Sequence, residues 1–409
     1  MRKIRALAGR LKKQLGSGYL VFLLVITVLS VSAYLLTLSR TVTDWYLDHA
    51  DPYLKAGLSK VLYLVPFPVR EAENVLGYLL AGVFVLLLIL LIFLRKRAGY
   101  RRFVLRFAQL GFVLVLTAYV LPNPFSNLKT RSSVLGNPQY EPGAYEQAEM
   151  TALWTGYVTE LNRLMHEAER DEHHHLILRS EDEVRSALAE ARVKVSAQYP
   201  RFRTDPPAVK DSMFPTFMKS YGVAAITSWP GGEIYMRSSI RSKGTFAAVY
   251  AHEFSHFSGF HREDEANYLA FVLCRSCGDP NIRYAAYLKN CFFLEAALDY
   301  SFFGKKEVSD EEYQSDAYKA FCASLAEIED YDLFFGDLSG NYTRYHKARG
   351  EEVPEQPDRP NDGTLPETLK KVVEDRGERH FENLQKELGA HYYDGVVQLL
   401  LDEQAGRLD

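Results

Sequence analysis

The stretch AHEFSHFSGFHREDEANYLA, residues 251–270, decides how the second half of this 409-residue chain can fold and what it can bind. His252 and His256 lie four residues apart in a pattern of helical spacing, so one helix would present both imidazoles on one face. Gly259 then favours a left-handed helix stop, after which a second helix can begin near Arg262. We therefore predict two short helices joined at Gly259, with both histidines on the first.

The spacing of the two histidines is typical of a zinc site. Two imidazole nitrogens four residues apart can bind one Zn²⁺ ion, and Glu253, about 100° around the helix, can reach a water on that ion without being a ligand. Zinc lowers the pKa of such a water, so a nearby carboxylate can deprotonate it. We predict His252 and His256 as ligands of one Zn²⁺ per chain, and Glu253 as the catalytic base.

A catalytic zinc ion normally has a third protein ligand. The position six residues after His256 is Arg262, which cannot bind zinc, so a pattern with a histidine at that position is disfavoured. His261, one residue earlier, is a minor candidate. Glu263 is the favoured ligand, because the Asn267 amide one turn later could hydrogen-bond a zinc-bound histidine. Glu265 is the alternative metal ligand, and the glutamate that is not used is expected to point to solvent or to Arg262.

A short hairpin is predicted directly before the histidine helix. In YGVAAITSWPGGEIYMRSS, residues 221–239, two β-prone runs flank a Pro-Gly-Gly turn. Helical spacing dominates the rest of the region. Residues 143–409 are therefore expected to form an α+β, mostly helical domain with a small β-hairpin or sheet before the histidine helix.

The first third of the chain predicts an α-helical membrane anchor at residues 1–121. Three uncharged or nearly uncharged runs predict spans near 16–39, 77–94 and 103–121, the third interrupted by Arg106. Basic clusters before the first run and between the second and third are expected to be cytoplasmic. The N-terminus would then be cytoplasmic, and everything after the third span would be extracytoplasmic. Residues 122–142, rich in Pro, Asn, Ser and Gly, are the expected linker.

The run HEFSHFSGFHREDEANYLAFVLC, residues 252–274, with RYAAYL at 283–288, resembles an uncharacterised bacterial family of membrane proteins, domain of unknown function 3810. The resemblance implies a zinc metallopeptidase of the bacterial cytoplasmic membrane. The EDEAN element is also similar to elements of gluzincin peptidases in which the first glutamate is the ligand, which matches Glu263. Only six residues separate His256 from Glu263, fewer than is usual in those enzymes.

The resemblance to zincin-type peptidases implies two further features. In those enzymes an edge strand before the active-site helix pairs with an extended substrate, and a side chain from elsewhere stabilises the oxyanion. The possible substrate strand comprises Gly232, Glu233, Ile234 and Tyr235. The possible oxyanion donors are Tyr284, Tyr287, His391 and Tyr393.

The favoured hypothesis is a multi-pass, membrane-anchored zinc metallopeptidase that hydrolyses peptide or protein substrates outside the cytoplasmic membrane. The alternative is a non-catalytic membrane receptor or scaffold of zincin fold that binds peptide or cell-wall material. Both hypotheses make the lipid bilayer a partner. A nucleotide or nucleic-acid role is not expected, because the chain has no glycine-rich phosphate loop and its basic clusters are explained by membrane topology. The sequence does not indicate an oligomeric state.

Overall fold

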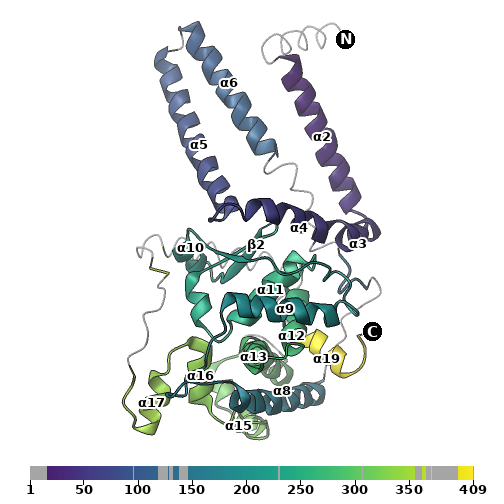
Figure 1. Cartoon of the computed structure of the whole chain (residues 1–409), viewed down its shortest axis with the longest axis vertical. Coiled ribbons are helices and arrows are strands. Elements are labelled where there is room, and N and C mark those ends of the chain that lie inside the picture. The colour runs from purple at the N-terminus through teal and green to yellow at the C-terminus, as the bar shows by residue number, and fades with distance from the viewer. Residues whose placement is uncertain are drawn as a thin grey trace. The chain divides into compact units, whose positions relative to one another are not determined.

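The computed structural model describes residues 16–94, 96–117, 128, 132–137, 146–228, 231–304, 308–354, 362–364, 370 and 395–408. The chain divides into two compact units: unit 1, Met1–Tyr46 with Val69–Ser132, and unit 2, Leu47–Pro68 with Ser133–Asp409 (Figure 1). Residues 47–68, which the sequence suggested were part of the anchor, thus belong to the same unit as the C-terminal domain. Most of the predicted linker 122–142 lies outside the described residues.

Unit 1 contains the two helices that are best suited to a membrane. Helix α2 (Ser17–Thr37) has 21 residues and helix α5 (Val69–Leu94) has 26, and both are long and apolar enough to span a bilayer. At a rise of about 1.5 Å per residue, each covers the roughly 30 Å of a hydrocarbon layer. Protein covers little of their surfaces, as expected for helices that face lipid.

The third predicted span is not confirmed. Helix α6 (Ala98–Val115) has 18 residues and includes Arg101, Arg102 and Arg106, so only its last turns are uninterrupted and apolar. The part after Arg106 is roughly 14 Å long, about half of a hydrocarbon layer. Residues 118–121 of the predicted span lie outside the described residues. Within the described chain, two helices and not three meet the length and composition of a span.

Unit 2 is mostly helical and contains a small mixed sheet, as predicted. The strands are β1 (Val209–Asp211), β2 (Ala225–Ser228) and β3 (Glu233–Met236), in the order β1-β3-β2. β2 and β3 form the predicted antiparallel hairpin, whereas β1 adds to β3 in parallel. The expectation that β3 is an edge strand open to substrate is therefore wrong, because both of its edges are paired within the sheet.

Gly232, at the start of this hairpin strand, is needed for close packing. Its φ is 65°, and a Cβ added there would lie 2.8 Å from the Cβ of Lys55 and 2.8 Å from the ring of Phe257. A larger side chain would separate the sheet from the histidine helix. This glycine therefore lets the strand pass directly against its neighbours.

The remaining elements of unit 2 are helices, and the histidine helix packs among some of them. Helix α11 (Phe246–Phe257) packs on α12 (Glu263–Arg275), and α12 packs on α13 (Pro280–Phe303), which in turn packs on α8 (Gln147–Glu167). The other described helices of unit 2, in chain order, are α4 (Asp51–Leu62), α9 (Glu181–Val195), α10 (Pro215–Ser220), the 3₁₀ turn η3 (Ser238–Ser242), α14 (Asp310–Tyr313), α15 (Asp316–Ala323), α16 (Tyr331–Ser339), α17 (Thr343–Arg349) and α19 (Gly395–Gln404). Helix α3 (Arg40–His49) joins the two units along the chain.

The predicted pair of helices joined at Gly259 is confirmed. Helix α11 ends at Phe257, and Gly259 has a φ of 96°, the left-handed conformation that glycine adopts without strain. Helix α12 then starts at Glu263, with three acidic residues in its first turn, where they interact favourably with the helix dipole. The sharp reversal brings the start of α12 against the side of α11 that carries the histidines.

Candidate metal centre

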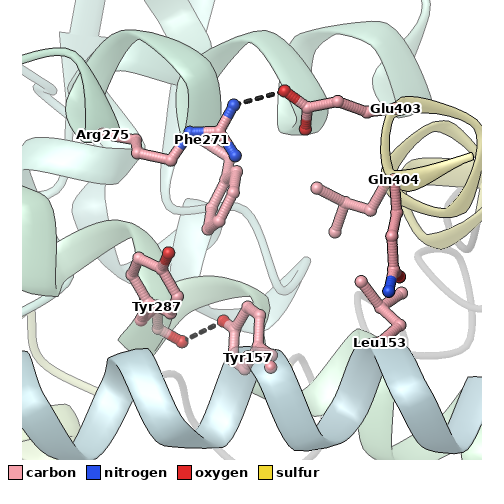
Figure 2. Close-up of a pocket in the computed structure, with 9 residues that line it drawn as sticks. Leu153, Tyr157, Phe271, Arg275, Tyr287, Glu403 and Gln404 are labelled. Carbon is pink, nitrogen blue, oxygen red and sulfur yellow. Dashed lines mark hydrogen bonds and ion pairs between the residues drawn. The ribbon is translucent and has the colours of Figure 1, made fainter. Parts of the chain in front are cut away.

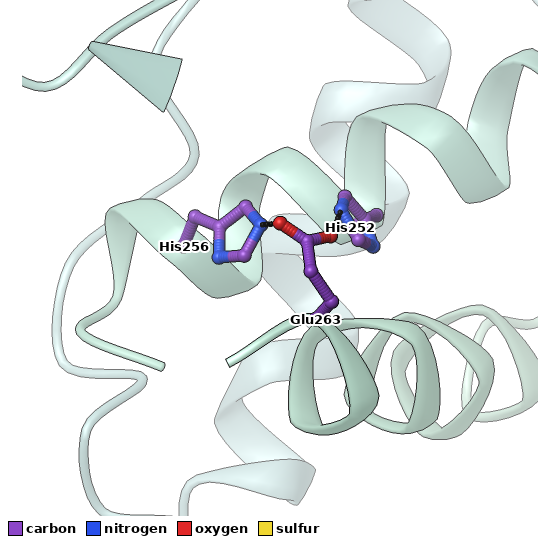
Figure 3. Close-up of side chains that lie close together, drawn as sticks. All are labelled: His252, His256 and Glu263. Atoms are coloured by element: carbon purple, nitrogen blue, oxygen red, sulfur yellow. Dashed lines mark ion pairs between the residues drawn. The ribbon is translucent and has the colours of Figure 1, made fainter. Parts of the chain in front are cut away.

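His252 and His256 on α11 meet Glu263 at the first position of α12 (Figure 3). Glu263 Oε2 lies 3.2 Å from His252 Nε2, and Glu263 Oε1 lies 3.5 Å from His256 Nε2. The three ligand atoms are all within 4.8 Å of one another. Tetrahedral ligands about 2.0–2.1 Å from a zinc ion lie roughly 3.3 Å apart, so this spacing fits a zinc ion. Among the described residues, this is the one such group of three.

The second imidazole nitrogen of His256 fixes the orientation of its ring. Nδ1 lies 2.8 Å from the backbone oxygen of Phe260 and donates a hydrogen bond to it, so Nε2 faces Glu263. A hydrogen bond of this kind, from the non-ligating nitrogen to a carbonyl, is the usual support of a metal-binding histidine. The turn between the two helices therefore orients one ligand as well as placing the next.

The charges of the three residues are coupled. Loss of contact with water would lower the pKa of His256, but the Glu263 carboxylate raises it to about 9. Burial would raise the pKa of Glu263, but the two imidazoles, His256 first, hold it well below its usual range. For His252 burial dominates and lowers the pKa. Glu263 is thus an anion ready to bind a cation, and a proton on His256 would have to leave when a metal binds.

Asn267 does not have the partner predicted for it. Its Oδ1 accepts a hydrogen bond from Lys289 Nζ on α13, whereas His252 Nδ1 is buried without a hydrogen-bond partner among the described residues. Asn267 therefore positions a lysine rather than a histidine. Its side chain follows the side of α12 that packs on α13, which the spacing from Glu263 alone could not show.

Lys289 is a residue of the site that the sequence analysis missed. Burial lowers its pKa to about 8, although the carboxylates of Glu263 and Glu253 partly oppose that shift. The lysine thus brings a positive charge to the two acidic groups of the centre. Its only signal in the sequence is a single basic residue within the otherwise largely apolar run YAAYLKNCFFLEAAL, residues 284–298, and such residues are common on helices.

Glu253, the predicted base, is held by the sheet. It is 4% exposed, and its Oε2 lies 2.7 Å from the hydroxyl oxygen of Thr227 on β2. The same hydroxyl lies 2.8 Å from the backbone oxygen of Glu253, so it can donate to either acceptor. The hairpin before the helix therefore positions the carboxylate that follows the first histidine. Thr227 was not singled out in the sequence, because no motif marks it.

Glu265, the alternative ligand, lies outside the group of three. The expectation that the unused glutamate points to solvent or to Arg262 is wrong. Glu265 is fully buried and accepts a hydrogen bond from the backbone nitrogen of Leu135. Arg262 instead pairs with Asp264, at 2.6 Å. The helical spacing turns Glu265 away from Glu263 and into the core.

Burial and the neighbouring Asp264 raise the pKa of Glu265 to about 7. A carboxyl whose pKa is higher in the folded than in the unfolded protein binds its proton more tightly when folded. Its contribution to stability is therefore full below the unfolded value near 4.5 and is lost as the pH rises through about 7. Glu265 is thus protonated in acidic solution and loses its proton as the pH passes through about 7.

The possible oxyanion donors that the structure describes have other partners. Tyr284 is fully buried and donates to Asp337 Oδ2 at 3.0 Å. Tyr287 lines a separate hollow beside Tyr157 and Phe271, with the Arg275–Glu403 ion pair at its edge (Figure 2). His391 and Tyr393 lie outside the described residues. The oxyanion role of Tyr284 and Tyr287 stays a prediction.

Fold and site together define a mostly helical domain with a two-histidine, one-glutamate group suited to a metal ion, in a chain with two helices able to span a membrane. The chain belongs to DUF3810, a family of proteins of unknown function, whose pattern matches residues 46–335. The resemblance predicted from the sequence is thus confirmed at the level of the family, and the match includes all of α11 and α12. No curated protein and no solved structure matches the chain.

Proposed function

We propose that this protein is a membrane-anchored zinc metallopeptidase that hydrolyses peptide bonds outside the cytoplasmic membrane. The observation that carries the proposal is the convergence of His252, His256 and Glu263, from two helices, on a space that fits a zinc ion. The arrangement resembles that of gluzincin peptidases in ligand chemistry, with two imidazoles and one carboxylate. Glu253, directly after the first histidine, supplies the further carboxylate that hydrolysis needs.

Each residue of the centre has a distinct task in the proposed reaction. A bound zinc ion would act as a Lewis acid and lower the pKa of water to near neutrality. His252, His256 and Glu263 would hold the ion. Glu253, kept in place by the Thr227 hydroxyl, would take a proton from the attacking water and pass it to the leaving amine. Lys289 would balance the negative charge of the two glutamates.

The sheet offers an edge for substrate at β2 rather than β3. β3 is paired on both sides, whereas β2 pairs only with β3 among the described strands. Thr227 of β2 contacts Glu253, so an extended peptide added along β2 would run close to the proposed base. Strand addition of this kind binds a peptide through backbone hydrogen bonds, largely regardless of its side chains.

Zinc content tests the proposal at its first step. Protein purified without chelators is expected to contain one zinc ion per chain by elemental analysis, and His252→Ala should lose it because one ligand is gone. His166→Ala, at an exposed histidine, is the matched control and should keep the zinc ion.

Zinc affinity should rise with pH up to about 9, as His256 loses its proton. Wild-type protein that binds no zinc would refute the proposal.

The extracytoplasmic location depends on how often the chain crosses the membrane. Leu47–Pro68 lies between α2 and α5 in the sequence, yet it is folded into unit 2. Lys55 Nζ donates to the backbone oxygen of His256 at 2.8 Å, and Lys210 Nζ donates to that of Leu62 at 2.9 Å. Both segments of unit 2 must therefore be on one side of the membrane. If α2 and α5 both cross, the chain must cross back between Leu94 and Ser133.

Helix α6 is the described helix in that interval, so the proposal includes a return crossing there despite its arginines. Arg106, in the middle of α6, donates to Gln109 one turn later at 2.9 Å, and a long basic side chain can extend towards the interface. The positive residues around the N-terminus and before α6 would then be cytoplasmic. The metal centre would be outside.

Reporter fusions test this topology. A fluorescent protein that matures only in the cytoplasm should be bright when fused after Arg97, whereas alkaline phosphatase, active only outside, should be active when fused to the C-terminus of the full chain. The reason is that one crossing at α6 separates the two positions. A C-terminal fusion that is fluorescent and lacks phosphatase activity would contradict the return crossing.

A further inference from the structure

Helix α4 is amphipathic, but its polar side is buried and its apolar side is exposed. Its polar residues Asp51 and Lys55 are each 1% exposed, and Ser59 is buried with them. Its large apolar side chains point away from unit 2, together with two that follow the helix; they are Tyr53, Leu54, Leu58, Val61, Leu64 and Phe67. A helix on a water-soluble domain buries its apolar side instead. The exposed side of α4 is therefore suited to an apolar environment.

The polar side of α4 is fixed against the turn that joins the two ligand helices. Lys55 Nζ pairs with Asp51 at 2.6 Å and donates to the backbone oxygen of His256 at 2.8 Å. Asp51 also lies 3.3 Å from His261 Nε2. Turning α4 to bury its apolar side would leave these charged groups without their partners, which is strongly unfavourable. The apolar side is thus held outward by the same contacts that support the metal centre.

The chain on both sides of α4 restricts what can cover it. Helix α2 ends at Thr37, α5 begins at Val69, and both are candidate spans. Only six residues separate Leu62 from Val69, and the seven Cα–Cα steps between them reach at most roughly 25 Å. Lys60 is exposed beside the apolar side chains, where it can meet lipid phosphates. A helix tethered this way, with apolar and basic surface together, fits the boundary layer of a bilayer.

We propose that the exposed apolar side of α4 is inserted in the interfacial layer of the membrane and seats the domain on it. The inference rests on the membrane anchoring within the proposed function, but not on zinc or hydrolysis. Because α4 also contacts the turn between the ligand helices, the metal centre is held close to the bilayer. The substrates it would reach are protein segments exposed next to the membrane surface, rather than proteins free in solution.

Site-specific fluorescence in lipid vesicles tests the inference with the full-length chain. A polarity-sensitive dye is attached through Leu58→Cys, and in a second variant through Leu54→Cys, with Cys322→Ser removing the one exposed native cysteine. The vesicles contain phosphatidylcholine and phosphatidylglycerol. They are prepared with and without lipids that carry a nitroxide on one acyl chain, close to the headgroup. Ile89→Cys in α5 is the lipid-facing reference, and Glu172→Cys, where the glutamate side chain is 88% exposed, is the water-facing reference.

The dye at positions 58 and 54 is expected to emit at shorter wavelength than at 172, and to be quenched by nitroxide lipid to within about twofold of position 89. Behaviour like that of position 172 would overturn the inference. A second outcome would also overturn it: a dye that is shielded from water but not quenched by nitroxide lipid, together with crosslinking of position 58 to another protein. In that case a second protein, and not lipid, would cover α4. Absence of quenching at position 89 would mean that the membrane anchor itself is wrong, whatever the zinc content.

Discussion

Replacing Glu263 with glutamine is expected to weaken zinc binding by more than about 100-fold. Loss of a group that only hydrogen-bonds a metal ligand typically weakens binding by about 10- to 100-fold, and loss of a ligand itself should cost more. The carboxylate lies between the two imidazoles, 3.2 Å from His252 and 3.5 Å from His256, and it supplies the negative charge of the group. A neutral amide cannot replace that charge. Competition with a chromophoric chelator measures the affinity, and hydrolysis should disappear together with the metal.

Glu265→Gln is the matched control, two residues away on the same helix. It should keep zinc at wild-type affinity, because Glu265 is buried beside Leu135 and outside the group of three. Its effect should be on stability instead. The glutamine cannot ionise, so the variant should gain stability relative to wild type as the pH rises above about 7. If Glu265→Gln lost zinc and Glu263→Gln kept it, the two residues would have to exchange roles.

Replacing Glu253 with glutamine is expected to lower kcat/KM by about 10²- to 10⁴-fold, the usual contribution of a general base, while one zinc ion per chain remains. Glu253 is not among the three converging residues, and an amide of the same shape can still accept the Thr227 hydrogen bond. Without a known substrate, the first measurement is the set of new protein termini in membrane and secreted fractions of cells. Termini that depend on the wild-type chain should vanish with the variant.

Glu172→Gln, at an exposed glutamate, should leave those termini unchanged. Thr227→Val should give an intermediate loss of activity with full zinc content, because the base remains but is less well held. A profile of termini that is the same with wild type and with Glu253→Gln would contradict catalysis. It would favour the alternative of a receptor or scaffold that binds peptide or cell-wall material without cleaving it.

The convergence of the three side chains could be predicted from the sequence because it is local. His252, His256, Gly259 and Glu263 lie within twelve residues, so helical periodicity and one left-handed glycine are enough to bring them together. The same reasoning correctly predicted the hairpin of β2 and β3 and a mostly helical domain. In each case the residues that interact are also neighbours in the chain.

The parts that could not be predicted depend on contacts between distant segments. β3 became a central strand because β1, which begins at Val209, pairs with it in parallel, and a short parallel strand has no local signature. Lys289 reaches Asn267 across two packed helices. Lys55 comes from a segment between two candidate spans, about two hundred residues before the His256 carbonyl that it contacts. Hydropathy alone places that segment with the anchor.

Unit 2 is built from two separate segments of the chain, and this has a consequence for proteolytic release of the domain from a membrane. A membrane enzyme whose whole domain follows its last span can be shed by a single cut and remain intact. Here such a cut, anywhere between α6 and α8, would leave α4 behind with the spans and remove Lys55 and Asp51 from the turn beside His256 and His261. On the proposed topology, shedding would thus remove this support from His252, His256 and Glu263, so the proposed enzyme would act only where it is anchored.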